Sequence, residues 1–198
     1  MIKTIISLLV FLIILTGFSL NKDEKTNGNQ RAYYQCSEPM DIDTNLVDLD
    51  TGKTYFYFDT TTEYYTEGED PQKYFRAYLI NNKSEKFTAK RQDESLIMIQ
   101  EALDENGNWL PIEYWVYSGC GNSYFNPLEL DSGKYVMIPI RKYSGYFNTK
   151  IRLKMKKDST LFYSQPFEGS IDKEQFQKET NQVHGILYHG KANYLDEN

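Results

Sequence analysis

One stretch organises the rest of this chain: Leu96-Ile-Met-Ile-Gln-Glu-Ala-Leu-Asp-Glu-Asn-Gly-Asn-Trp-Leu-Pro-Ile-Glu-Tyr-Trp-Val-Tyr-Ser-Gly-Cys-Gly-Asn-Ser-Tyr124. Two hydrophobic runs flank a turn sequence at residues 104–108. Asn106-Gly107 within it is the dipeptide that tolerates positive φ at both central positions of a type I′ turn. The stretch therefore predicts a β-hairpin, with both tryptophans on its return strand and Cys120 in the loop that follows.

Further short strands are predicted on both sides of this hairpin. They fall at residues 45–49, 53–58, 74–80, 86–90, 126–130, 135–140, 150–155 and 161–165. In the strand at 150–155, strict alternation places Ile151, Leu153 and Met155 on a buried face and the basic residues between them in solvent. Pro111 cannot donate to a β-ladder, so its part of the return strand must lie at an edge, at a bulge or at a first position.

The only helical pattern lies at residues 170–178, where Ser170 or Asp172 can cap the first turn. The pattern as a whole predicts an all-β fold, an antiparallel immunoglobulin-like β-sandwich with one short C-terminal helix. A jelly roll or a small barrel is the alternative. We expect a signal peptide at 1–19, a flexible leader at 20–40, the sandwich at 41–169, and a short helix and tail at 170–198.

The N-terminus has the features of a secretory signal peptide. Lys3 gives a positive start, Ile5–Thr16 is apolar, and Gly17-Phe-Ser19 provides small residues for cleavage. The apolar run is shorter than the ~20 residues that a membrane-spanning helix needs, although an uncleaved anchor is the alternative. The sequence therefore predicts a secreted or periplasmic protein.

Export would allow the two cysteines, Cys36 and Cys120, to form a disulfide bond. In the chain-entropy model, closing the 120 − 36 = 84-residue loop stabilises the fold by about 4–5 kcal/mol. Two free thiols, or pairing with another chain, are the alternatives.

Several function classes fit the sequence poorly. The net charge of −6 argues against a nucleic-acid partner, because such proteins carry a basic stripe. The acidic turn at Asp104 departs from a calcium loop at the required glycine, where Trp109 stands. A cysteine hydrolase would need Cys120 as nucleophile with His184 or His189 as base, and both histidines lie in an irregular tail. We expect no metal and no other cofactor.

Tyrosine is unusually frequent, with 17 residues against two tryptophans. Aromatic side chains on a β-sandwich can stack against the apolar faces of sugar rings, or they can fill the core between the sheets. The candidate ligand-binding aromatics are Tyr55, Tyr57, Trp109, Tyr114 and Trp115.

Two motifs carry a family resemblance. Pro111-Ile-Glu-Tyr-Trp115 and Cys120-Gly-Asn-Ser-Tyr124, together with the signal peptide and the Asn-Gly hairpin, resemble secreted immunoglobulin-like proteins of unknown function from Bacteroidetes-type bacteria. The resemblance covers residues 74–176. It implies a fold and an export route, and it brings no catalytic residues.

These observations lead to one expected function. The protein should be an exported, non-catalytic binding or structural module of the cell envelope, with a glycan or an envelope protein as its partner. A carbohydrate-binding module that uses surface aromatics is the more specific alternative, and a cysteine-dependent hydrolase is the third.

Overall fold

The computed structural model describes residues 28–42, 52–65, 72–119, 124–180, 182–183 and 190–196 of the 198-residue chain. The predicted signal peptide, the predicted strand at 45–49, Cys120, His184 and His189 lie outside the described residues. Within the described part, nearly all regular structure is β, and all but one of the strand pairs are antiparallel. The predicted all-β class is therefore confirmed.

The first of two larger sheets has four antiparallel strands. Their order is β2 (Met40–Asp41), β12 (Lys134–Arg141), β4 (Lys73–Asn81) and β3 (Thr54–Tyr65). β4 and β12 pair along eight residues, from Asn81 opposite Lys134 to Tyr74 opposite Arg141. The register of β3 shifts between Asp59 and Glu63, which produces a bulge in an otherwise continuous pairing.

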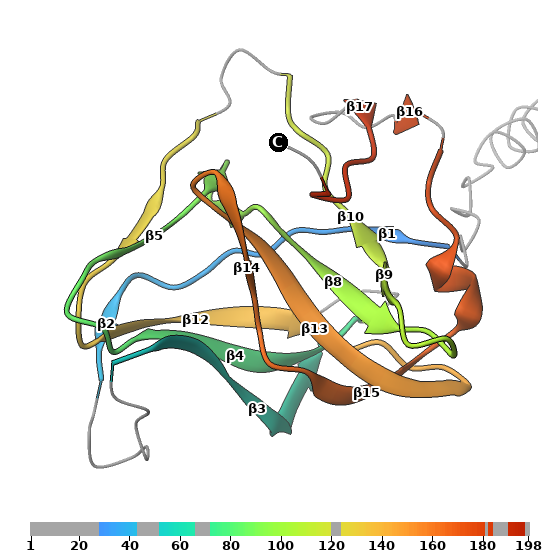
Figure 1. Ribbon diagram of the computed structural model, residues 1–198, viewed down its shortest axis with the longest axis horizontal. Helices are drawn as coiled ribbons and strands as arrows, with labels where there is room; N and C mark the ends of the chain where they lie inside the picture. The colour runs from blue at the N-terminus through green and yellow to red at the C-terminus, as the bar shows by residue number, and fades with distance from the viewer. Residues whose placement is uncertain are drawn as a thin grey trace, which may run out of the picture.

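The second larger sheet is arranged around β13 (Phe147–Lys157), the long diagonal strand in Figure 1. One edge of β13 pairs with β8 (Met98–Leu103), which in turn pairs with β9 (Trp109–Pro111). The other edge pairs first with β14 (Thr160–Tyr163) and then with β15 (Phe167–Ile171). Pro111 therefore lies on an edge strand, as its missing N–H predicts.

Four short pairs complete the described structure. They are β1 (Gln30–Arg31) with β10 (Glu113–Tyr114), β5 (Phe87–Ala89) with β11 (Leu128–Leu130), β6 (Arg91–Gln92) with β7 (Ser95–Leu96), and β16 (Gln182–Val183) with β17 (Gly190–Lys191). The β1–β10 pair is the parallel one.

One hydrophobic core joins the two larger sheets. The four-stranded sheet contributes alternate residues of β3, β4 and β12, and the other sheet contributes β8 and β13. Its members include Phe56, Phe75, Leu79, Ile138, Ile140, Ile99, Leu153 and Met155. β3, β4, β12 and β13 direct alternate side chains into this layer, as the strand period of two requires. β8 departs from this alternation, because its neighbouring residues Met98 and Ile99 both belong to the core.

The central hairpin is confirmed, but its turn is not type I′. A type I′ turn needs a positive φ at two successive residues, but in this hairpin only Gly107 has one, at +83°. The Gly107 N–H donates to the Asp104 carbonyl over 3.1 Å, and Asp104 Oδ1 accepts the N–H groups of Asn106 and Asn108. This is the longer hairpin loop in which a type I turn is followed by a left-handed glycine. Asp104 favours this loop because its side chain accepts hydrogen bonds from two backbone N–H groups.

The predicted C-terminal helix is wrong. Residues 170 and 171 belong to β15, and only a single 3-10 turn, η2 (Lys173–Phe176), follows. Ile171 of β15 pairs with Phe147 of β13, and this pairing holds the start of residues 170–178 in an extended conformation. The Gln175 side chain then accepts the N–H of Asp172, which stabilises one short turn.

Both predicted flexible ends contain packed residues. The sequence predicts a flexible leader at residues 20–40, but Ala32 and Tyr34 within it are buried in the core. Residues 170–198 were expected as helix and tail, but Leu195 is buried there, and the Asn193 backbone exchanges two hydrogen bonds of 2.8 Å with Trp115. The described parts of both ends therefore belong to the fold.

The buried face of β13 is predicted correctly, and its outer face only in part. Ile151, Leu153 and Met155 are buried. Lys154, expected in solvent, is only 3% exposed because residues 194–196 lie over it. In the part of the chain that the structure describes, no helix has the length and apolar character to cross a membrane.

Candidate functional site

The outer surface of the four-stranded sheet is rich in tyrosine. Phe56, Leu79 and Val136 point into the core, so the alternate positions on the same strands point outward. The outward tyrosines are Tyr55, Tyr57, Tyr64, Tyr74, Tyr78 and Tyr135, and we call this surface the tyrosine face.

Strand register brings these rings into contact across three neighbouring strands. Tyr57 of β3 lies opposite Tyr78 of β4, with ring centres 6.1 Å apart. Tyr78 in turn makes an edge-to-face contact with Tyr135 of β12 at 5.7 Å. Tyr64 stacks on Tyr74 at 5.8 Å, beyond the bulge. Tyr57, Tyr78 and Tyr135 therefore form one row of rings, and Tyr64 and Tyr74 form a stacked pair on the same face.

This surface combines apolar and polar groups. Ile80 lies opposite both Tyr55 and Tyr135 in the register and is only 4% exposed. The exposed Arg76 places its guanidinium 5.9 Å from the ring centre of Tyr64, and Tyr57 is 47% exposed. Phenol hydroxyls and a guanidinium can bind hydroxyl groups of a ligand, while the ring faces cover its apolar parts.

Trp109 lies on a different surface, the outer side of the second sheet. The guanidinium carbon of Arg152 is 4.4 Å from its ring centre and 4.3 Å from that of Tyr163. Arg152 also donates two hydrogen bonds to Glu101, of 2.8 and 2.6 Å. The Trp109 ring therefore already stacks on a side chain of its own sheet.

The five predicted aromatics are thus not brought together. Tyr55 and Tyr57 share the tyrosine face, Trp109 stacks on Arg152, and Tyr114 is half-buried on β10. Trp115 is buried in the core, where its ring meets Tyr117 edge to face. Burial raises the pKa of Tyr114. Only Tyr55 and Tyr57 of the five therefore lie on the tyrosine face.

Four residues of the tyrosine face are not among the aromatics predicted from the sequence: Tyr64, Tyr74, Tyr78 and Tyr135. Tyr74, Arg76 and Tyr78 are alternate residues of β4, so their side chains lie on the same face of the strand. The contact of Tyr74 with Tyr64, and those of Tyr78 with Tyr57 and Tyr135, depend on which strands pair and in which register, and no local sequence pattern specifies that.

A buried carboxylate, Glu113, forms the second polar centre of the molecule. Its Oε2 accepts the hydroxyl of Tyr34 over 2.5 Å and the N–H of Gln100 over 2.9 Å, and its Oε1 accepts the hydroxyl of Tyr143 over 2.7 Å. Arg141 Nη1 donates to the Tyr143 hydroxyl over 3.4 Å. Desolvation, together with the charge of Glu113, raises the pKa of both tyrosines well above the usual value.

These contacts indicate a structural role for Glu113. Its oxygens are occupied by groups from three separate segments, and the adjoining cavity, lined in part by Gln100, Arg141 and Tyr143, has a volume of only about 40 Å³. Such a space can hold water but no organic substrate.

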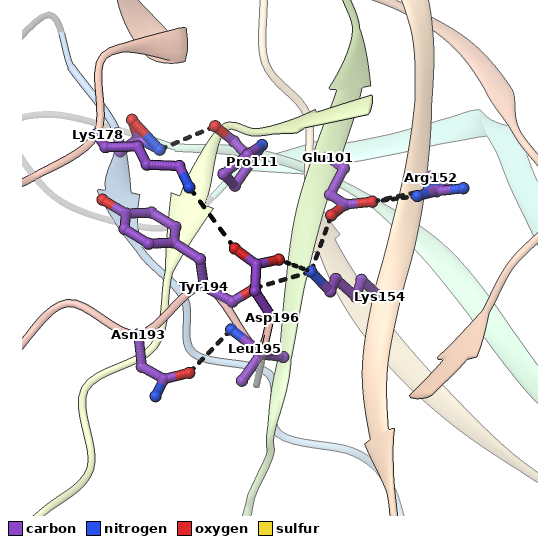
Figure 2. A network of polar contacts seen from close by, with 10 residues as sticks. Glu101, Pro111, Arg152, Lys154, Lys178, Asn193, Tyr194, Leu195 and Asp196 are labelled. Carbon is purple, nitrogen blue, oxygen red and sulfur yellow. Dashed lines mark hydrogen bonds and ion pairs between the residues drawn. The ribbon is translucent and has the colours of Figure 1, made fainter. Parts of the chain in front are cut away.

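The C-terminal segment forms the third polar centre, shown in Figure 2. Lys154 Nζ lies 3.1 Å from Glu101 Oε1, and it donates to the Asp196 carboxylate over 2.5 Å and to the Tyr194 carbonyl over 3.0 Å. Lys178 lies 4.7 Å from the ring centre of Tyr194. These contacts hold the last described residues against β8 and β13.

Cys36 is half-buried beside Arg91, and burial raises the pKa of its thiol. Its predicted disulfide partner, Cys120, lies outside the described residues, so the bridge stays a prediction. Among the residues that the structure describes, no group of three or more His, Cys, Asp or Glu side chains could hold a metal ion.

Comparisons of this chain with protein-family models, with curated proteins and with solved structures found no match. No residue role can be transferred from a relative.

Proposed function

We propose that this protein is an exported, non-catalytic module of the cell envelope that binds carbohydrate across the tyrosine face. The observation that carries the proposal is the aromatic row Tyr57–Tyr78–Tyr135, which spans three adjacent strands with neighbouring rings 6.1 and 5.7 Å apart. An extended glycan can lie along such a row, with the apolar faces of its sugars against the rings.

The chemistry of the surrounding residues supports this ligand class. A purely apolar face would favour a protein partner with an apolar surface, whereas each ring of the row Tyr57–Tyr78–Tyr135 carries a phenol hydroxyl. Arg76 adds a cationic donor at the same surface. Strands of a rigid sheet also hold the rings in place, so that little side-chain entropy is lost on binding.

Export and fold class form part of the proposal. The apolar Ile5–Thr16 segment, with its short positive start and small residues at the cleavage position, supports secretion by a signal peptide. Two antiparallel sheets with a shared core are compatible with a β-sandwich. We propose the immunoglobulin-like arrangement as its finer description.

A glycan array followed by calorimetric titration tests the proposed function. We expect one or more polysaccharides to bind the protein, and Tyr57→Ala and Tyr78→Ala to weaken each of these interactions by about tenfold, the effect of losing one stacked ring. Tyr33→Ala is the matched control, because Tyr33 is 46% exposed, close to the value for Tyr57, and lies outside the sheet. A blank array would contradict carbohydrate binding and would favour a protein partner.

A further inference from the structure

An open groove of about 440 Å³ lies apart from the tyrosine face. None of the residues that line it belongs to β3, β4 or β12. Three of them are cationic: Lys90, Arg91 and Lys156. Asp158 is the single carboxylate in the lining, so the groove is locally basic on a chain whose net charge is −6. Such a concentration of charge attracts anions.

The backbone fixes two of these cations relative to each other. The N–H of Lys156 donates to the carbonyl of Ile97 over 2.9 Å, the N–H of Ile97 donates to Lys90 over 3.0 Å, and the N–H of Lys90 donates to Lys156 over 3.1 Å. These three bonds form a closed ring of contacts between segments far apart in sequence. The two lysine side chains therefore start from a rigid base.

Arg91 is oriented by its own contacts. Its Nε donates to the Asn126 carbonyl over 3.1 Å, and its Nη1 lies 3.4 Å from the largely exposed carboxylate of Glu94. In the part of the chain that the structure describes, Lys90 Nζ has no ion-pair partner, and its side chain is exposed at the groove. A ligand carboxylate can bind Lys90 without displacing an internal ion pair.

The other lining residues suit a ring with an apolar face. Phe125 is 64% exposed, Tyr117 is half-buried, and the buried side chain of Ile97 adds an aliphatic surface. The groove volume falls within the range of small-molecule sites, about 300–1,000 Å³. The site thus combines cations with aromatic and aliphatic surface.

We infer that this groove binds an acidic sugar, a hexuronate unit whose carboxylate contacts Lys90 and Lys156 and whose ring packs against Phe125. Charge selects the carboxylate, and the aromatic and aliphatic residues select the ring. This site goes beyond the proposed carbohydrate face, because it uses different strands and requires a charged sugar.

Calorimetric titration with digalacturonate, with neutral galactobiose and with inorganic phosphate tests the inference. We expect digalacturonate to bind most tightly, with an affinity that falls as ionic strength rises. Lys90→Gln and Lys156→Gln should each weaken binding about fivefold, the effect of one partly exposed ion pair. Phe125→Ala should weaken binding of digalacturonate by a similar factor. Lys83→Gln, an exposed lysine in the 82–86 turn, should have no effect.

Each other result overturns the inference in a recognisable way. Equal binding of galactobiose would remove the role of the charge, and equal binding of phosphate would remove the role of the ring. No binding of digalacturonate, or binding that is unchanged in Lys90→Gln and Lys156→Gln, would exclude the groove as its site. Binding that is lost in Tyr57→Ala instead would assign the acidic sugar to the tyrosine face.

Discussion

The hydroxyl of Tyr34 lies 2.5 Å from Glu113 Oε2, although the two residues are 79 positions apart. Tyr143 donates to the other oxygen of the same carboxylate over 2.7 Å. The contact joins the N-terminal segment to β10 and to the chain that follows β12. A buried carboxylate of this kind is stable only while its donors remain in place.

Replacing Glu113 should destabilise the whole fold. In Glu113→Gln an amide N–H₂ takes the place of one carboxylate oxygen and faces a hydroxyl donor in a buried site. We expect the free energy of unfolding to fall by about 3 kcal/mol. Urea unfolding measures this change, and Glu129→Gln on the exposed side of β11 is the control. An unchanged midpoint for Glu113→Gln would contradict a structural role.

The same centre should make the protein sensitive to alkali. Desolvation raises the pKa of Tyr34 and Tyr143 in the folded state, so the unfolded chain loses these protons first as the pH rises. Their stabilisation is complete below the ordinary tyrosine pKa, about 10, and is lost above it. Melting temperatures of the double variant Tyr34→Phe and Tyr143→Phe should therefore change less above pH 10 than those of the parent. Parallel curves for the two proteins would contradict this.

Gly145 should not accept any side chain. A Cβ at this position would lie 2.1 Å from the Ile171 carbonyl carbon and 2.3 Å from the Asp172 nitrogen, both backbone atoms. We expect Gly145→Ala to lower the free energy of unfolding by about 3 kcal/mol, because β15 must move. Gly119→Ala is the control, since nothing lies within 4 Å of its Cβ position and its φ is not left-handed. Chemical denaturation of both variants makes the comparison, and equal midpoints would refute it.

Acid should release the C-terminal segment. Burial alone would raise the pKa of Asp196, but the hydrogen bonds and positive charges of Lys154 and Lys178 together outweigh burial, so the pKa is lowered. The contact therefore stabilises the fold fully above the ordinary aspartate pKa, about 3.9, and is lost as the pH falls below it. The protection factor of the Leu195 amide, which is the exchange rate of the unfolded chain divided by that of the folded protein at the same pH, should fall below that pH. In Asp196→Asn exchange should be fast at neutral pH too, whereas Asp131→Asn should leave it slow.

The disulfide bond between Cys36 and Cys120 remains a testable prediction. Gln35 forms an isolated antiparallel β-bridge with Ser95, and the Gln92 side chain exchanges two hydrogen bonds of 3.1 and 3.2 Å with the Ser118 backbone. Cys36 and the start of the loop that contains Cys120 therefore lie against the same segment. Thiol titration of the unfolded protein from the native host should find no free cysteine, and Cys120→Ser should lower the melting temperature in non-reducing buffer only. Two free thiols per chain would end the prediction.

Local sequence was sufficient wherever the signal repeats within one strand. The alternation in residues 150–155 identified Ile151, Leu153 and Met155 as buried, because the strand period of two needs no partner to be read. The hairpin could be predicted as well, because its turn residues are also a local signal in the sequence. The turn type was missed because Asp104 satisfies the backbone N–H groups of Asn106 and Asn108 and selects a longer loop.

What tertiary structure added is the set of contacts between distant segments. Lys154 has the sequence context of a solvent-facing residue, and it is buried because Asp196 and Tyr194 cover it. Likewise, the tyrosine face exists only because β4 pairs with β3 in one direction and with β12 in the other. Register and coverage depend on the packing of whole sheets, so composition and periodicity determine which residues can form a strand but not which residues meet across it.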